Sequence, residues 1–114
     1  MGIEETDFRV VFGTTKIEYD FAKEDSNRIK HGYSLESAAN LLEKWVFTIF
    51  TTRFITHTPI VKNGEVRHKH IGVDDNGNIV FMVTTMRYNE TVRVISFRKA
   101  HASEIATFKA LTKL

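Results

Sequence analysis

The spacing of hydrophobic and polar residues changes along this 114-residue chain, and each change predicts a different element. From residue 8 to residue 21, β-branched and aromatic residues partly alternate with polar ones around Gly13, which predicts one or two short strands joined by a turn. Asp20 is a typical helix N-cap, because its carboxylate accepts a backbone N–H of the first turn. We therefore expect a helix over about residues 21–31, ended by Gly32, which readily takes a left-handed conformation.

A second helix is predicted directly afterwards, with Ser34 as its N-cap. Its apolar residues recur at helical spacing and lie on one face: Leu35, Ala38, Ala39, Leu42 and Trp45. From Val46 to about residue 58 the chain is rich in Val, Ile, Phe and Thr, which predicts β-structure too long for one strand without a bend. Pro59 and the residues 62–65 then indicate a loop or a hairpin turn.

The second half of the chain has the pattern of an antiparallel sheet. Residues 66–73 and 78–88 flank Asn76 and Gly77, a pair that favours a tight hairpin turn. The first part of the later segment, residues 79–83, is apolar on both faces and predicts a central strand. Residues 92–99 predict another strand, and apolar residues about three apart in 102–114 predict a terminal amphipathic helix.

These elements together predict an α+β fold: an N-terminal strand, two short helices, an antiparallel meander of three to four strands, and a C-terminal helix. The length suits one domain that spans residues 1–114. Within it, residues 1–16 are expected to form an N-terminal extension or an extra strand.

Composition narrows the class of protein. Sixteen Lys and Arg against fourteen Asp and Glu give a formal net charge of +2, and the pI is about 9.0, so a basic patch forms only if the cations cluster. The chain has no cysteine, which excludes disulfides and thiolate metal sites and suits a reducing compartment. The polar N-terminal residues do not resemble a secretory signal, and the apolar stretch at about 45–55 is too short and polar to span a bilayer. We therefore expect a cytoplasmic protein that does not bind membranes.

Three blocks of the sequence, in this order and spacing, resemble one known family. The first comprises Tyr19-Asp20, Lys23, Asn27, Lys30-His31-Gly32, Leu35, Ala38 and Ala39; the second Arg67 and Ile71-Gly72; the third Arg93, Ile95-Ser96, Arg98, Ala100 and Glu104. They resemble the BrnT family, a RelE-like group of ribonuclease toxins from type II toxin–antitoxin systems. The resemblance covers residues 17–108.

The resemblance implies a RelE-like fold and an endoribonuclease that cleaves RNA without a metal or other cofactor. It also implies a hetero-oligomer with a BrnA-like antitoxin that covers the basic face of the toxin. The chain departs from the family pattern at Phe108, where a Tyr is usual, and in residues 44–66, which are longer and more apolar. These departures keep an alternative open: a catalytically inactive protein-interaction or RNA-binding module on the same scaffold.

Cleavage of RNA without metal needs a base for the 2′-hydroxyl, cations for the phosphate and an acid for the leaving oxygen. The candidate catalytic residues are Arg98, Arg67, Lys30, His31 and Glu104, and the candidate RNA-binding residues are Lys23, Asn27, Arg93 and Ser96. In a regular strand, Arg98 and Ser96 lie on one face and Arg93 and Lys99 on the other, unless a bulge intervenes. We therefore expect Arg98 to bind phosphate before Arg93; the alternative is an edge strand protected by cations.

The remaining candidates also have structural interpretations. Lys23, Asn27 and Lys30 fit one helical face, which either binds RNA or is simply solvated. His31 can act as an acid or base near neutral pH, or cap its helix. Glu104 can act as a base, but pairing with Arg98 is the stronger expectation. Two alternating histidines at 68 and 70 do not suffice for a metal site, and none is expected.

Overall fold

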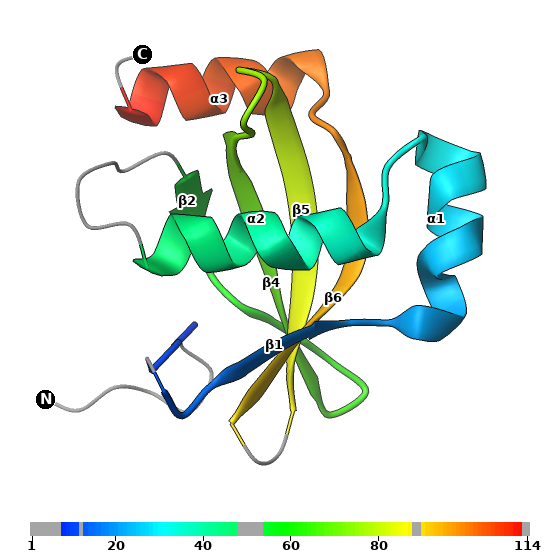
Figure 1. Ribbon diagram of the computed structural model, residues 1–114. Coiled ribbons are helices and arrows are strands. Elements are labelled where there is room, and N and C mark those ends of the chain that lie inside the picture. The colour runs from blue at the N-terminus through cyan, green and yellow to red at the C-terminus, as the bar shows by residue number, and fades with distance from the viewer. Residues whose placement is uncertain (1–7, 12, 48–53, 88–89, 113–114) are drawn as a thin grey trace, which may run out of the picture.

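The computed structural model describes residues 8–11, 13–47, 54–87 and 90–112. Its strands are β1 (Lys16–Tyr19), β2 (Phe54–Thr56), β3 (Ile60–Lys62), β4 (Glu65–Val73), β5 (Ile79–Arg87) and β6 (Thr91–Lys99). Its helices are a 3-10 turn, η1 (Phe21–Lys23), followed by α1 (Glu24–His31), α2 (Leu35–Phe47) and α3 (Ala102–Thr112). The predicted α+β fold is confirmed, and Figure 1 shows the arrangement.

The strands form one mixed sheet in the order β1-β6-β5-β4-β2, and β3 also pairs with β4. All pairs are antiparallel except β1 and β6, which run parallel. The apolar strand β5 lies in the middle of this order, as its pattern predicts. The Asn63-Gly64 turn joins β3 to β4 with positive φ at both residues, which is the backbone that this pair favours in hairpins.

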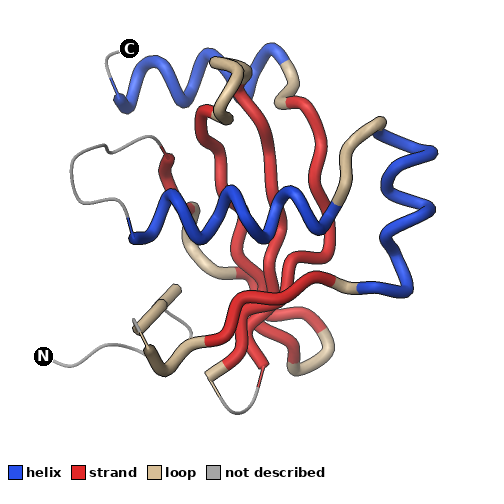
Figure 2. Tube along the Cα trace, viewed as in Figure 1, coloured by secondary structure: helices blue, strands red, loops and turns tan. Residues whose placement is uncertain are grey.

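Helices α2 and α3 pack on opposite faces of the sheet. Alternate residues of β5 point to the two faces: Val80 and Met82 pack with Leu35 and Leu42 of α2, whereas Phe81 packs with Phe108 of α3. We call these the α2 face and the α3 face. Figure 2 shows that α3 crosses the strands only near one end of the sheet.

Helix α1 stands beside β6 and is tied to it by one polar side chain (Figure 1). The buried side-chain amide of Asn27 donates to the carbonyl oxygens of Tyr33 and Phe97, both at 2.8 Å, and its oxygen accepts from the Phe97 N–H at 3.3 Å. A buried backbone group without a partner is costly, so this amide fixes where α1 and the turn into α2 lie.

The replacement Asn27→Ala is expected to lower the free energy of unfolding by about 2–4 kcal/mol, because it leaves buried backbone groups without partners. Urea denaturation of the two proteins measures the difference. The matched control is Ile29→Ala in the same helix, since Ile29 is 87% exposed and its loss should change stability little. Equal effects of the two substitutions would contradict a role for Asn27 in holding α1.

Several boundaries differ from those predicted. Val46 and Phe47 continue α2 rather than starting a strand, because the helix end packs on the core. Residues 8–11 form no strand, and most of the predicted long strand, residues 48–53, lies outside the described residues. In α3 only Ile105 and Phe108 pack on the sheet; Leu111 is 65% exposed because the helix extends past the sheet.

Candidate functional site

A bulge in β6 places its polar residues on a single face. Val83 of β5 pairs with Ser96 whereas Thr84 pairs with Val94, so Ile95 is an extra residue between them. The extra residue resets the alternation of the strand. Arg93, Ser96 and Arg98 therefore all lie on the α3 face, and the prediction that Arg93 and Arg98 lie on opposite faces is wrong.

The pairing of β4 with β5 places cations of β4 on the same face of the sheet as Arg93 and Arg98. Arg67 pairs with Thr85, which in turn pairs with Arg93, so the two arginines occupy the same row of the sheet on either side of β5. Lys69, two residues along β4, lies on this face as well. We call the following set the cationic track: Lys23, Arg67, Lys69, Arg87, Arg93 and Arg98.

Carboxylates hold two of these arginines in place. The Arg67 Nε lies 2.8 Å from a Glu65 oxygen, and the Arg93 Nε lies 2.6 Å from a Glu18 oxygen. The hydrogen bond from Arg67 lowers the pKa of Glu65, and the charges of Arg87 and Lys23 add to that effect. Lys23, in η1 before α1, is included in the track because its charge acts on Glu65.

Arg98 is the most constrained cation of the track. Its two terminal nitrogens donate to the two oxygens of Glu104 at 2.8 and 3.0 Å, and its guanidinium carbon lies 4.1 Å from the centre of the Phe81 ring. Stacking and a forked ion pair both suit the planar guanidinium group. The expected pairing of Arg98 with Glu104 is observed, and the Arg98 side chain is still 18% exposed.

Glu104 also fixes the start of α3. Its carboxylate accepts the backbone N–H of His101 at 2.7 Å, which satisfies one of the free amides at the helix N-terminus. The hydrogen bond from Arg98, aided by the His101 N–H, lowers the pKa of Glu104. A carboxylate with a lowered pKa is a weaker base, so this environment suits positioning of Arg98 better than proton abstraction.

His31 lies at the same end of the sheet, at the last residue of α1. Burial lowers its pKa, and the positive charges of Lys30, Arg98 and His101 lower it further. The left-handed Gly32, and not His31, is the C-cap of the helix. The lowered pKa favours the neutral imidazole, which is the form that can accept a proton.

The predicted face of Lys23, Asn27 and Lys30 does not form one solvent-facing surface. Asn27 is only 7% exposed and its side chain is occupied by backbone groups, so the structure gives it a positioning role instead of a contact with RNA. Helical spacing alone cannot distinguish an outward from an inward face.

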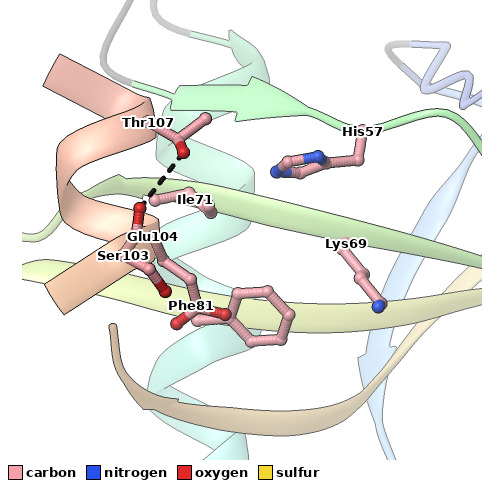
Figure 3. Close-up of a pocket in the computed structure, with 7 residues that line it drawn as sticks. All are labelled: His57, Lys69, Ile71, Phe81, Ser103, Glu104 and Thr107. Carbon is pink, nitrogen blue, oxygen red and sulfur yellow. Dashed lines mark hydrogen bonds between the residues drawn. The ribbon is translucent and has the colours of Figure 1, made fainter. Parts of the chain in front are cut away.

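A pocket adjoins the Arg98–Glu104 pair under α3. It has a volume of about 240 Å³ and is lined by His57, Lys69, Ile71, Phe81, Ser103, Glu104 and Thr107. Figure 3 shows the His57 ring reaching over the pocket toward Thr107. Sequence reasoning missed His57 because its place depends on β2 pairing: Thr56 lies opposite His70, and the next residue, His57, donates its N–H to the Lys69 carbonyl at 2.9 Å.

The two histidines of β4 lie elsewhere. His68 and His70 are buried on the α2 face, at 1% and 0% exposure, away from the cationic track. The described residues contain no group of three or more His, Cys, Asp or Glu side chains that could hold a metal ion. Among the described helices, none is long and apolar enough to cross a membrane.

Comparison with known proteins agrees with this fold. The model of the family "Ribonuclease toxin, BrnT, of type II toxin-antitoxin system" matches residues 19–104. The crystal structure of the Brucella abortus ribonuclease toxin BrnT is similar with a TM-score of 0.57 and 25% sequence identity, over 77% of this chain and 99% of that chain. No curated protein sequence matches this chain.

The class is thus that of small α+β toxins from type II toxin–antitoxin systems. Within it, the chain belongs to the BrnT family of ribonuclease toxins. Membership in this family implies an antitoxin as the partner.

Proposed function

We propose that this toxin is a metal-independent endoribonuclease whose active site lies where β6, α1 and α3 meet. The observation that carries the proposal is the bulge at Ile95, which gathers Arg93, Ser96 and Arg98 on the face that also bears Arg67. Cations on a surface can bind successive phosphates of an RNA backbone. A guanidinium held in one orientation can bind one phosphate through two of its oxygens.

The proposed reaction is attack of the ribose 2′-oxygen on the adjacent phosphorus. A bond forms from O2′ to phosphorus and the bond from phosphorus to O5′ breaks, which leaves a 2′,3′-cyclic phosphate and a 5′-hydroxyl. His31 takes the proton of the 2′-hydroxyl, and Lys30 donates a proton to the leaving O5′. Arg98 neutralises the charge that develops on the phosphate oxygens, while Arg67, Arg93, Lys23 and Ser96 hold the strand.

The buried position of Phe108 supports the catalytic interpretation over an inactive module. Phe108 is 0% exposed and packs between α3 and the sheet. The hydroxyl that a Tyr would add here belongs to the interior, so its absence removes nothing from the cationic track. Phe54 and Ile55, at the end of the long apolar stretch, are partly buried against the two cores, whereas residues 48–53 of that stretch lie outside the described residues.

The antitoxin, in this proposal, is a BrnA-like protein that forms a hetero-oligomer with the toxin and covers the cationic track. A partner with acidic groups would replace the phosphates of RNA on the same arginines. Neutralisation and RNA binding would then exclude each other.

Purified toxin is expected to cleave a labelled RNA in the presence of EDTA, because every proposed group belongs to the chain itself. Mass analysis of the fragments should find 2′,3′-cyclic phosphate ends. An added BrnA-like antitoxin should stop the cleavage and restore growth of cells that express the toxin. Loss of activity in EDTA, with recovery on adding Mg²⁺, would contradict the metal-independent mechanism.

A further inference from the structure

The pocket under α3 has no part in the mechanism proposed above, although it touches the residues of that mechanism. Its floor is apolar, formed by Ile71 and Phe81, and Arg98 stacks on the same Phe81 ring. Its rim is polar, with Ser103, Glu104 and Thr107 from α3 on one side and His57 and Lys69 on the other. A ligand in this pocket would therefore lie next to the phosphate bound by Arg98.

His57 gives the strongest sign that the pocket holds a ligand. Its backbone N–H is bound to the Lys69 carbonyl, which fixes the residue over the pocket (Figure 3). Its ring nitrogen Nε2 is buried, and within the part of the chain that the structure describes no group hydrogen-bonds it. A buried ring nitrogen without a partner is costly, and a ligand that supplies the missing hydrogen bond recovers that free energy.

The volume of the pocket and the chemistry of its lining together indicate which ligand it suits. The volume of about 240 Å³ is below the roughly 300–1,000 Å³ of pockets for drug-sized molecules, so the site suits one planar ring system. An apolar floor takes the face of a base, and polar groups around it meet the hydrogen-bonding edge, as in proteins that recognise single-stranded RNA. A nucleobase satisfies both requirements, whereas a phosphate would lie against the apolar floor.

We propose that this pocket binds the base of a nucleotide next to the scissile phosphate and so gives the toxin a base preference. This inference rests on the ribonuclease function proposed above. The Thr107 hydroxyl donates to the Ser103 carbonyl at 3.1 Å, so it accepts a hydrogen bond from the edge of the base, and His57 Nε2 makes a second one. The base lies against Ile71 and the part of Phe81 that Arg98 leaves uncovered. Lys69 at the rim binds a phosphate of the same strand.

The test is digestion of an RNA library with randomised sequence, followed by sequencing of the fragment ends. Wild type is expected to show a base preference at one position beside the cut. His57→Ala, which removes the ring, and Thr107→Leu, which fills the pocket, should each reduce that preference on the order of tenfold. Cleavage at sites that lack the preferred base should continue at the wild-type rate. The matched control is Ala106→Leu, an exposed position of α3 outside the pocket lining.

The outcomes separate the two proposals. A wild type that cleaves without base preference, or variants that keep the preference, would overturn the base pocket and leave the ribonuclease standing. No cleavage by wild type would overturn both. Variants that keep the preference but escape neutralisation by the antitoxin would show that the pocket receives a side chain of that protein instead of a base.

Discussion

The substitution Arg98→Ala is expected to slow RNA cleavage by about 10²–10³-fold, the usual loss when one fixed donor to a transition-state oxygen is removed. Its ion pair with Glu104 and its stacking on Phe81 hold the guanidinium in one orientation before RNA binds. Preorganised charge of this kind stabilises the transition state without rearrangement. Single-turnover rates with a labelled RNA measure the effect, and expression of the variant should no longer arrest growth.

The sequence offers a matched control in the next residue. Lys99→Ala removes the same charge, but Lys99 pairs with Val80 and so lies on the α2 face, away from the track. It should change cleavage only through the small loss of net charge, which added salt suppresses. If both variants lose activity equally, Arg98 acts only through net charge and the proposed site is wrong.

A second pair of variants separates chemistry from positioning. Glu104→Gln keeps an oxygen for the His101 N–H but removes the charge that orients Arg98. Cleavage should fall by less than in Arg98→Ala, since the guanidinium remains. Arg98→Lys keeps a positive charge without the planar fork, so it should resemble the alanine variant more than wild type.

How far the sequence determined this site depends on the range of each interaction. The caps, the hairpin turns and the central strand follow from neighbouring residues, and they were predicted correctly at Asp20, Gly32, the Asn63-Gly64 turn and β5. Asn76 and Gly77 also lie between two paired strands as predicted, but Gly77 has a positive φ and Asn76 does not. The bulge in β6 was not predicted, because residues 93–98 contain no glycine and because the bulge depends on how β6 pairs with β5. Two adjacent buried residues, Val94 and Ile95, were the local signal for it.

The positions of Asn27 and His57 could not be predicted from nearby residues either. Asn27 has the spacing of a surface residue, yet its partner Phe97 lies 70 positions away, so only the packed structure reveals its role. His57 follows a stretch with no distinctive motif and gains its place from the pairing of β2 with β4. Contacts between distant segments decide both positions, and spacing along the chain contains no information about them.

His70 is expected to make the fold sensitive to mild acid. The buried ring bridges three strands: Nδ1 lies 2.9 Å from the Thr56 hydroxyl and Nε2 lies 2.8 Å from the Thr84 hydroxyl. Burial, with smaller contributions from His68 and His57, lowers the pKa of His70 to about 3, against 6.5 for an unperturbed histidine. The folded protein therefore keeps this ring neutral at a pH where the unfolded chain protonates it.

The sign of the effect follows from that difference. Between pH 6.5 and about 3 the unfolded chain binds one proton more at this residue, so acid favours unfolding. The free energy of unfolding should fall by about 1.4 kcal/mol for each pH unit below 6.5 and should be unaffected by His70 above it. The lowered pKa of Glu104 acts in the same direction, but only below its ordinary value of 4.5.

Urea denaturation at pH 7.5, 6.0 and 5.0 tests this dependence in a window where carboxylates contribute little. His70→Gln should be less stable than wild type at pH 7.5 because its shape differs, but its stability should fall less steeply toward pH 5.0. His101→Gln provides a comparison at an exposed histidine, since the His101 side chain is 69% exposed. His31 also has a lowered pKa, so His31→Gln determines the share of the slope that belongs to the proposed active site. Equal slopes for wild type and His70→Gln would place the acid sensitivity outside the Thr56–His70–Thr84 bridge.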